Sequence, residues 1–300
     1  MKIVVGTRGS KLALVQTNWV VDELKKANPE IEFEVKIIKT KGDLVTHLPL
    51  HKIGDKGLFT KEIEQQLLDK EIDLAIHSMK DMPSSLPEGL KFASIPKRED
   101  PRDVLVLKEG YNDINDLPKG AKIGTGSKRR TYQLLKYRPD LEIVPIRGNI
   151  DTRIRKIEDE NLDGIVLAAA GLNRAGLNHH ISYHLPVDIM IPAPAQGALA
   201  LEIREDDSNM EKIISHIKDE MTEIQVAAER GFLRGVNGSC HIPMGAYCEI
   251  KDNKLNLSGL YGDEEGNKLV IKSITGAIEE AEKIGFELAK NILKEYNSLE

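Results

Sequence analysis

The sequence has few cysteines, few aromatic residues and no long apolar run. Its 300 residues include two cysteines, Cys240 and Cys248, and aromatic residues make up 4% of the chain. Two thiols cannot build a disulfide framework, which favours a reducing compartment over a Cys240–Cys248 bridge. No apolar stretch is long enough to cross a bilayer or resembles a secretion signal at the N-terminus. We therefore expect a cytoplasmic protein with no membrane partner.

Negative charge exceeds positive charge overall, but positive charge is concentrated in one region. The chain has 42 Lys and Arg against 48 Asp and Glu, a net charge of -6, which argues against a nucleic-acid partner. Nine of the basic residues lie between Lys122 and Arg155, where there are three acidic residues, a local balance of +6 (9 − 3). This distribution predicts a site for a small, multiply charged anion.

Strand and helix patterns alternate along the chain, as is typical of an α/β protein. Residues 2–6 form a β-branched run, after which Ser10 is placed to cap a helix. Two proline-bounded segments, residues 95–103 and 191–197, predict that the chain crosses between two lobes, with the strand at 198–203 returning to the first sheet. We expect two hinged lobes resembling periplasmic binding proteins and a small C-terminal α+β domain. The predicted domains are residues 1–97 plus 197–217, 98–196 and 218–300.

Several local elements can also be predicted. Residues 41–56 show little periodicity and are expected to form a loop or lid, in which Lys52 and Lys56 face either substrate or solvent. Thr222 begins a capping-box pattern for a helix that reaches Arg234. Other predictions are a helix capped by Thr60, a strand over 163–170, a hairpin from 255–260 and 269–274, and a final helix that packs through Ile278, Ala281, Leu288 and Ile292.

Cys240 lies in a segment with the composition of a loop. A helical pattern ends at Gly235, and the following residues to 245 contain further glycines and a proline. A thiol on such a polar loop can form a covalent bond, although a small residue that only fills the loop is the simpler alternative.

Cationic side chains follow several of the predicted strands. Arg8 lies in a strand-to-helix turn, and residues 122–130 combine two glycines, two hydroxyls and Arg129–Arg130 in an anion nest that lacks the Walker A spacing. Because Arg129 and Arg130 are adjacent, we expect that they cannot both point the same way. Asp81 is an acid among these cations, suited to stabilise positive charge or move a proton, unless it only fixes the turn before Pro83.

The order and spacing of these segments resemble the porphobilinogen deaminase family over essentially the whole chain. No single motif identifies the family by itself, but the motifs together, in this order and at this spacing, are specific for it. The matching segments are 7–13 (TRGSKLA), 57–59 (GLF), 77–83 (HSMKDMP), 98–103 (REDPRD), 147–149 (RGN), 169–172 (AAGL), 194–197 (PAQG) and 238–243 (GSCHIP).

This resemblance implies a dipyrromethane cofactor joined through a thioether to Cys240. It implies that four porphobilinogen molecules are condensed head to tail with loss of ammonia, and that hydrolysis releases a linear tetrapyrrole, hydroxymethylbilane. Asp81 is implied as the catalytic residue that handles cationic intermediates. The implied cofactor-binding residues are Lys80, Ser127, Arg129, Arg130 and Gly148. The implied substrate-binding residues are Arg8, Ser10, Lys52, Lys56, Phe59, Arg147, Arg153, Arg174 and Gln196.

Two departures from the family pattern stand out: Ser239 replaces a usual glycine, and Gly126 and Lys128 flank Ser127 where serine and leucine are frequent. Neither removes a charged anchor, so activity is expected. We expect a monomer that uses no metal. The alternatives are a non-enzymatic solute-binding protein, since two hinged lobes suit ligand capture, and a cysteine hydrolase with a distant histidine such as His77 or His51 as the base.

Overall fold

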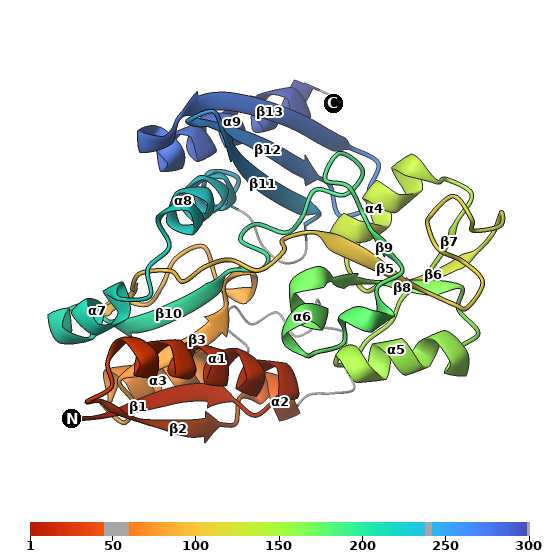
Figure 1. Ribbon diagram of the computed structural model, residues 1–300. Coiled ribbons are helices and arrows are strands. Elements are labelled where there is room, and N and C mark those ends of the chain that lie inside the picture. The colour runs from red at the N-terminus through yellow and green to blue at the C-terminus, as the bar shows by residue number, and fades with distance from the viewer. Residues whose placement is uncertain (45–59, 238–241, 299–300) are drawn as a thin grey trace. The chain divides into compact units, whose positions relative to one another are not determined.

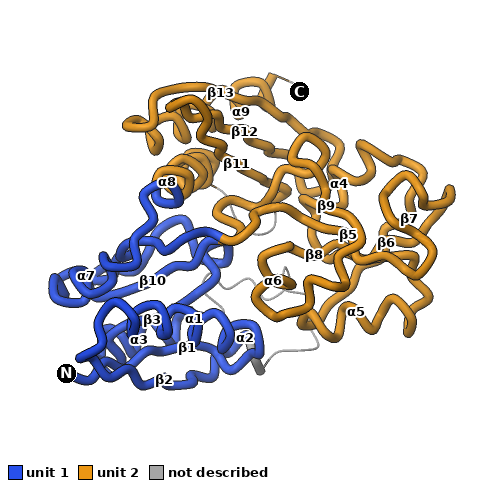
Figure 2. Tube along the Cα trace, viewed as in Figure 1, with its two compact units in different colours: residues 1–98, 198–223 blue, residues 99–197, 224–300 orange. Residues whose placement is uncertain are grey.

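The computed structural model describes residues 1–44, 60–237 and 242–298 (Figure 1). The chain forms two compact units, residues 1–98 with 198–223 and residues 99–197 with 224–300 (Figure 2). Each unit combines mixed sheets with helices, so the expected α/β class is confirmed.

The first unit contains a five-stranded sheet in the order β2-β1-β3-β10-β4. Strands β1, β2 and β3 run parallel, whereas β10 is antiparallel to both of its neighbours. The predicted return of residues 198–203 to this sheet is therefore confirmed. The elements of this unit are β1 (Lys2–Arg8), α1 (Lys11–Ala27), β2 (Glu32–Ile38), α2 (Lys41–Leu44), α3 (Lys61–Leu68), β3 (Leu74–Ser78), the 3-10 turn η2 (Met79–Asp81), β4 (Leu90–Phe92), β10 (Leu199–Arg204) and α7 (Ser208–Ser215).

Apolar packing on both faces explains why β3 begins with three successive apolar residues, Leu74, Ala75 and Ile76. Leu74 and Ile76 point to one face and belong to the same core cluster as Leu24 of α1. Ala75 points to the other face and packs with Ile63 of α3. A strand covered on both faces must be apolar at successive positions, so β3 can be recognised from its sequence.

The second unit has a five-stranded sheet with the same pattern of directions, in the order β7-β6-β8-β5-β9. Strands β6, β7 and β8 are parallel, and β5 is antiparallel to β8 and β9. The elements around this sheet are β5 (Asp103–Leu107), β6 (Lys122–Gly124), α4 (Lys128–Tyr137), β7 (Glu142–Val144), α5 (Ile150–Asp159), β8 (Gly164–Ala168), α6 (Ala169–Arg174), η3 (Asn178–His180) and β9 (Tyr183–His184).

The C-terminal part of this unit is a three-stranded antiparallel sheet packed against helices. Strands β11 (Met244–Lys251), β12 (Lys254–Gly262) and β13 (Leu269–Ala277) pair in sequence order. Helix α8 (Glu220–Gly235), the turn η4 (Ile278–Glu280) and helix α9 (Ala281–Ser298) complete it. Phe232 of α8 and Leu288 of α9 are buried with Leu257 in one core. The predicted hairpin and final helix are confirmed, but β11 was not predicted.

Three local predictions are wrong. Helix α8 begins before Thr222, and Asp219 caps it by accepting a hydrogen bond from the Thr222 amide at 2.8 Å. The Thr222 hydroxyl instead accepts a hydrogen bond from the Arg98 amide at 3.0 Å. The strand predicted over 163–170 ends at Ala168, since the next two residues begin α6. Residues 41–44 of the predicted loop form helix α2, and residues 45–56 lie outside the described residues.

Candidate functional site

Arg8, Ser10, Lys80 and Asp81 lie at one edge of the sheet of the first unit. Strands β1 and β3 are parallel neighbours, so their C-terminal ends meet at that edge. Ser10 caps α1, since its hydroxyl accepts a hydrogen bond from the amide of Ala13 at 3.3 Å. The carboxyl ends of parallel strands are where α/β proteins bind ligands, which makes this edge a candidate site.

Asp81 is the last residue of the short turn η2, and its side chain is exposed. The Met79 amide donates to the carbonyl of Ala198 at 3.0 Å, and the Met82 amide donates to Met79 at 3.1 Å. These bonds fix the backbone of the turn against the start of β10. No hydrogen bond joins the Asp81 carboxylate to another described residue, which leaves the idea that it fixes its own turn without support.

In the second unit, Arg129 and Arg130 meet on the buried carboxylate of Asp103. Arg129 Nη1 donates to Asp103 Oδ2 at 2.6 Å, and Arg130 donates to Oδ1 through Nε at 3.0 Å and Nη2 at 2.7 Å. Gln196 Nε2 donates to the same Oδ1 at 3.1 Å. The carboxylate is fully buried. Burial alone would raise the pKa of Asp103, but the two guanidinium groups hold that pKa well below its usual range.

The expectation that Arg129 and Arg130 cannot point the same way is wrong. One carboxylate accommodates both guanidinium groups, because each approaches a different oxygen of Asp103. Asp103 was not recognised as part of a site. It ends a charged segment whose other charges look solvated. The sequence feature that could have indicated its burial is its position at the start of the apolar run of β5.

Arg147, Arg153 and Gly148 follow β7 at the same edge of the second sheet as Ser127 and α4. Arg153 Nε donates to the carbonyl of Gly148 at 2.7 Å. Gly148 has a φ of +128°, and a Cβ there would lie 2.7 Å from Thr152 Cγ2, so a glycine is required. Burial, together with the charges of Arg130 and Arg147, lowers the pKa of Arg153 to about 10. This cluster therefore carries an excess of positive charge that a bound anion would relieve.

Arg174 and Ser127 complete the cationic edge of the second unit. Arg174 Nη2 donates to the carbonyl of Gly197 at 2.7 Å, and burial lowers the pKa of Arg174 to about 10, against the opposing charge of Glu99. Ser127 occupies the N-cap position of α4, but its hydroxyl makes no capping bond. The first turn of α4 contains no acidic residue, so its amide dipoles and basic side chains both favour an anion.

The structure therefore groups the predicted residues in two sets. Arg8, Ser10, Lys80 and Asp81 share an edge of the first sheet, whereas the others that are described belong to the second unit. Four of the predicted residues lie outside the described residues: Lys52, Lys56, Phe59 and Cys240.

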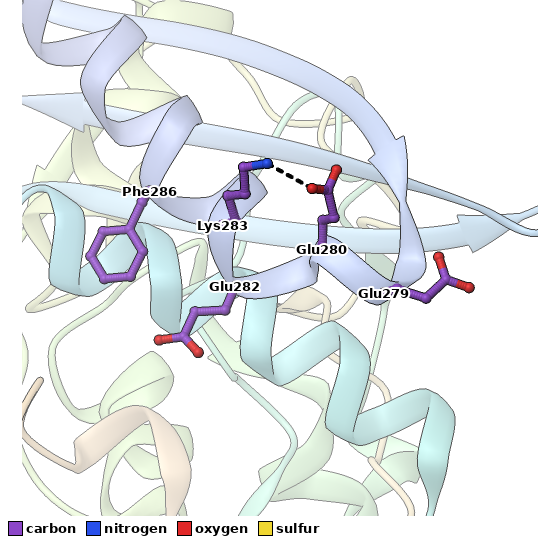
Figure 3. Close-up of a pocket in the computed structure, with 5 residues that line it drawn as sticks. All are labelled: Glu279, Glu280, Glu282, Lys283 and Phe286. Carbon is purple, nitrogen blue, oxygen red and sulfur yellow. Dashed lines mark hydrogen bonds and ion pairs between the residues drawn. The ribbon is translucent and has the colours of Figure 1, made fainter.

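A pocket on the C-terminal part contains none of the predicted site residues. It is lined by Glu279, Glu280, Glu282, Lys283 and Phe286 of η4 and α9 (Figure 3). Lys283 Nζ is paired with Glu280 at 2.6 Å. Because three carboxylates line this pocket against one cation, it does not suit an anionic ligand.

Two family models together match most of the chain. The model described as "Porphobilinogen deaminase, dipyromethane cofactor binding domain" matches residues 3–212, and "Porphobilinogen deaminase, C-terminal domain" matches residues 223–294. Curated relatives named porphobilinogen deaminase include one from Clostridioides difficile (strain 630), 68% identical over 100% of both chains. Another, from Clostridium novyi (strain NT), is 60% identical over 99% of this chain and 100% of that one.

Comparison with solved structures gives matches of low sequence identity, two of which are as follows. One is a periplasmic binding protein of Salmonella typhimurium, 16% identical over 74% of this chain and 93% of that one, with a TM-score of 0.40. Another is the L-cystine solute receptor of Neisseria gonorrhoeae, 15% identical over 77% and 90%, with a TM-score of 0.42. Among the described residues, no helix is both long and apolar enough to cross a membrane.

Proposed function

The chain belongs to the porphobilinogen deaminase family, and from that premise we propose that it is a hydroxymethylbilane synthase. It condenses four porphobilinogen molecules head to tail, releases one ammonia for each, and frees the linear tetrapyrrole by hydrolysis. The observation that carries the proposal is the excess of cationic side chains around Asp103, because both substrate and product carry several carboxylates.

The residues of the second unit fit a dipyrromethane with carboxylate side chains. Asp103 offsets one of the charges of Arg129 and Arg130, so the pair keeps a net positive charge. Burial and the neighbouring arginines disfavour the charged form of Arg153, and a bound carboxylate would reverse that effect. Arg side chains read carboxylates in a bidentate manner. When bound to Cys240, the dipyrromethane supplies the pyrrole end to which new substrate is joined.

We assign the substrate-facing roles to both units. Arg8 and Ser10, with Arg147, Arg153 and Arg174, bind the acetate and propionate groups of porphobilinogen. Lys52, Lys56 and Phe59 are assigned to the same task. Gln196 is 1% exposed and donates to Asp103, so we assign its side chain to the support of Arg129 and Arg130.

Asp81 stabilises the positive charge that develops on porphobilinogen as its amino group leaves, and accepts a proton. The exposed carboxylate on a fixed turn suits this role, because it is accessible and needs little reorganisation. Lys80, the residue before it, is assigned to the cofactor together with Ser127, Arg129, Arg130 and Gly148.

We further propose that the enzyme works as a cytoplasmic monomer. Its domains are residues 1–97 plus 197–217, 98–196, and 218–300, the last of which carries Cys240. Light scattering after size-exclusion chromatography tests the monomer, since a mass near 33.4 kDa is expected.

The direct test supplies purified protein with porphobilinogen and measures ammonia and hydroxymethylbilane together. Four ammonia released for each tetrapyrrole is the expected ratio. Tight binding of porphobilinogen without ammonia release would instead favour a solute-binding protein.

A further inference from the structure

Glu229 of helix α8 is a buried carboxylate that joins two distant backbone segments. It is fully buried, and its Oε2 accepts a hydrogen bond from the Ala195 amide at 2.6 Å. Its Oε1 accepts one from the Cys248 amide of β11 at 2.9 Å. A carboxylate that accepts backbone hydrogen bonds in the interior holds both segments firmly, because charge-assisted bonds are the strong ones.

The segment that Glu229 holds has a strained backbone. Ala195 has a φ of +60°, the left-handed conformation that residues with a Cβ disfavour. Such conformations persist only where the surrounding structure imposes them, and they concentrate at functional sites. The hydrogen bond from the Ala195 amide to Glu229 is one interaction that imposes it here.

The strained residue directly precedes Gln196, which contacts the arginine site. Gln196 Nε2 donates to the carbonyl of Pro101 at 2.7 Å and to Asp103 Oδ1 at 3.1 Å. Asp103 in turn receives the guanidinium groups of Arg129 and Arg130. A continuous set of contacts therefore runs from α8 through residues 195–196 to the arginine pair.

We propose that Glu229 is a positioning residue for the arginine site, acting through the left-handed backbone of Ala195 and the side chain of Gln196. Helix α8 ends at Gly235, five residues before Cys240 in the sequence, so the helix that carries Glu229 also precedes the proposed attachment thiol. The inference rests on the proposed function, because it assigns the arginine pair to carboxylate binding.

The test compares Glu229→Gln with the double variant Glu229→Gln/Ala195→Gly. Glutamine has one acceptor oxygen, whereas the amides of Ala195 and Cys248 both need an acceptor. One of these two hydrogen bonds is therefore lost, and the glutamine NH2 group faces that backbone N–H. We expect KM for porphobilinogen to rise and the rate at which cofactor-free protein gains its adduct to fall, each by roughly tenfold, the effect of one lost charge-assisted bond. Glycine adopts a φ of +60° without strain, so Ala195→Gly should restore both quantities several-fold. The exposed Glu287→Gln is the charge-matched control.

Adduct formation is followed by intact mass, turnover by kcat and KM, and folding by the thermal midpoint. The inference is overturned if Glu229→Gln matches the wild type in loading and KM, or if only its thermal midpoint falls. It is also overturned if Ala195→Gly restores nothing in the folded double variant. Should Glu229→Gln not fold, Glu229→Asp keeps the charge but is too short for both amides, and the same rise in KM is expected. A wild type that neither loads nor turns over would instead refute the proposed function itself.

Discussion

Removing the charge of Asp103 should destabilise the protein strongly, because it is the shared partner of two buried guanidinium groups. In Asp103→Asn the amide keeps the shape but cannot offset the charges of Arg129 and Arg130, which are each 6% exposed. Its Nδ2 group would also face an arginine donor. Breaking a buried ion pair by removing one partner costs about 3–5 kcal/mol of unfolding free energy. We expect a loss of this size at pH 7.

The pH dependence of stability provides a second test of the role of Asp103. The pKa of Asp103 is depressed in the folded protein, so its contribution is present above the unfolded pKa and is lost as pH falls through the folded one. The difference in unfolding free energy between the wild type and Asp103→Asn should therefore be constant above about pH 4, near the ordinary pKa of aspartate. In more acidic solution this difference should become smaller. Urea denaturation of both proteins across that range measures it.

Asp140 provides the matched control. It forms a two-point pair with Arg138, at 2.8 Å to Nε and 2.7 Å to Nη2, but this pair lies near the surface. Solvent screens such a pair, so Asp140→Asn should lose much less unfolding free energy than Asp103→Asn. If the two variants lose the same stability, or if Asp103→Asn matches the wild type, the assignment of Asp103 as the buried anchor is wrong.

Three further variants test other parts of the structure. Asp81→Ala should keep the Cys240 adduct or form it slowly, but its turnover, measured as ammonia released at fixed times, should be far below that of the wild type. Near-normal turnover would remove Asp81 from the mechanism. Burial raises the pKa of Glu64, and the carboxylate of Glu202 adds to the rise, so the ionised side chain destabilises the folded protein as pH increases above the unfolded pKa. Glu64→Gln removes this ionisation and should raise the thermal midpoint at pH 8 but not at pH 4. Tyr132 donates from its hydroxyl to the carbonyl of Glu264 at 2.7 Å, so Tyr132→Phe should lose about 1 kcal/mol in urea denaturation, and no loss would mean that this contact is absent in solution.

The elements that the sequence predicts well are those with a strong local signal. Residues Leu74 to Ile76 of β3 are apolar because α1 and α3 cover the two faces of the strand, and the cap at Ser10 lies next to the helix that it begins. The sequence also predicts that cationic side chains follow strands, and in the second sheet these side chains share an edge because parallel strands β6, β7 and β8 end together.

The remaining features depend on contacts between distant parts of the chain. Asp103 looks like one more solvated charge until β5 is placed between β8 and β9 and brings it under Arg129 and Arg130. Glu229 likewise has an ordinary place in a helix, and its role follows from contacts with Ala195 and Cys248. Local sequence does not encode which distant backbone amides a buried carboxylate will meet.

The intact mass of the denatured, active enzyme tests the central assignment most directly. We predict that the wild type carries two linked pyrrole units and that Cys240→Ser lacks them. Cys248→Ser, which changes a buried residue of β11, should retain them. A fully active enzyme whose mass matches the unmodified chain would contradict the account.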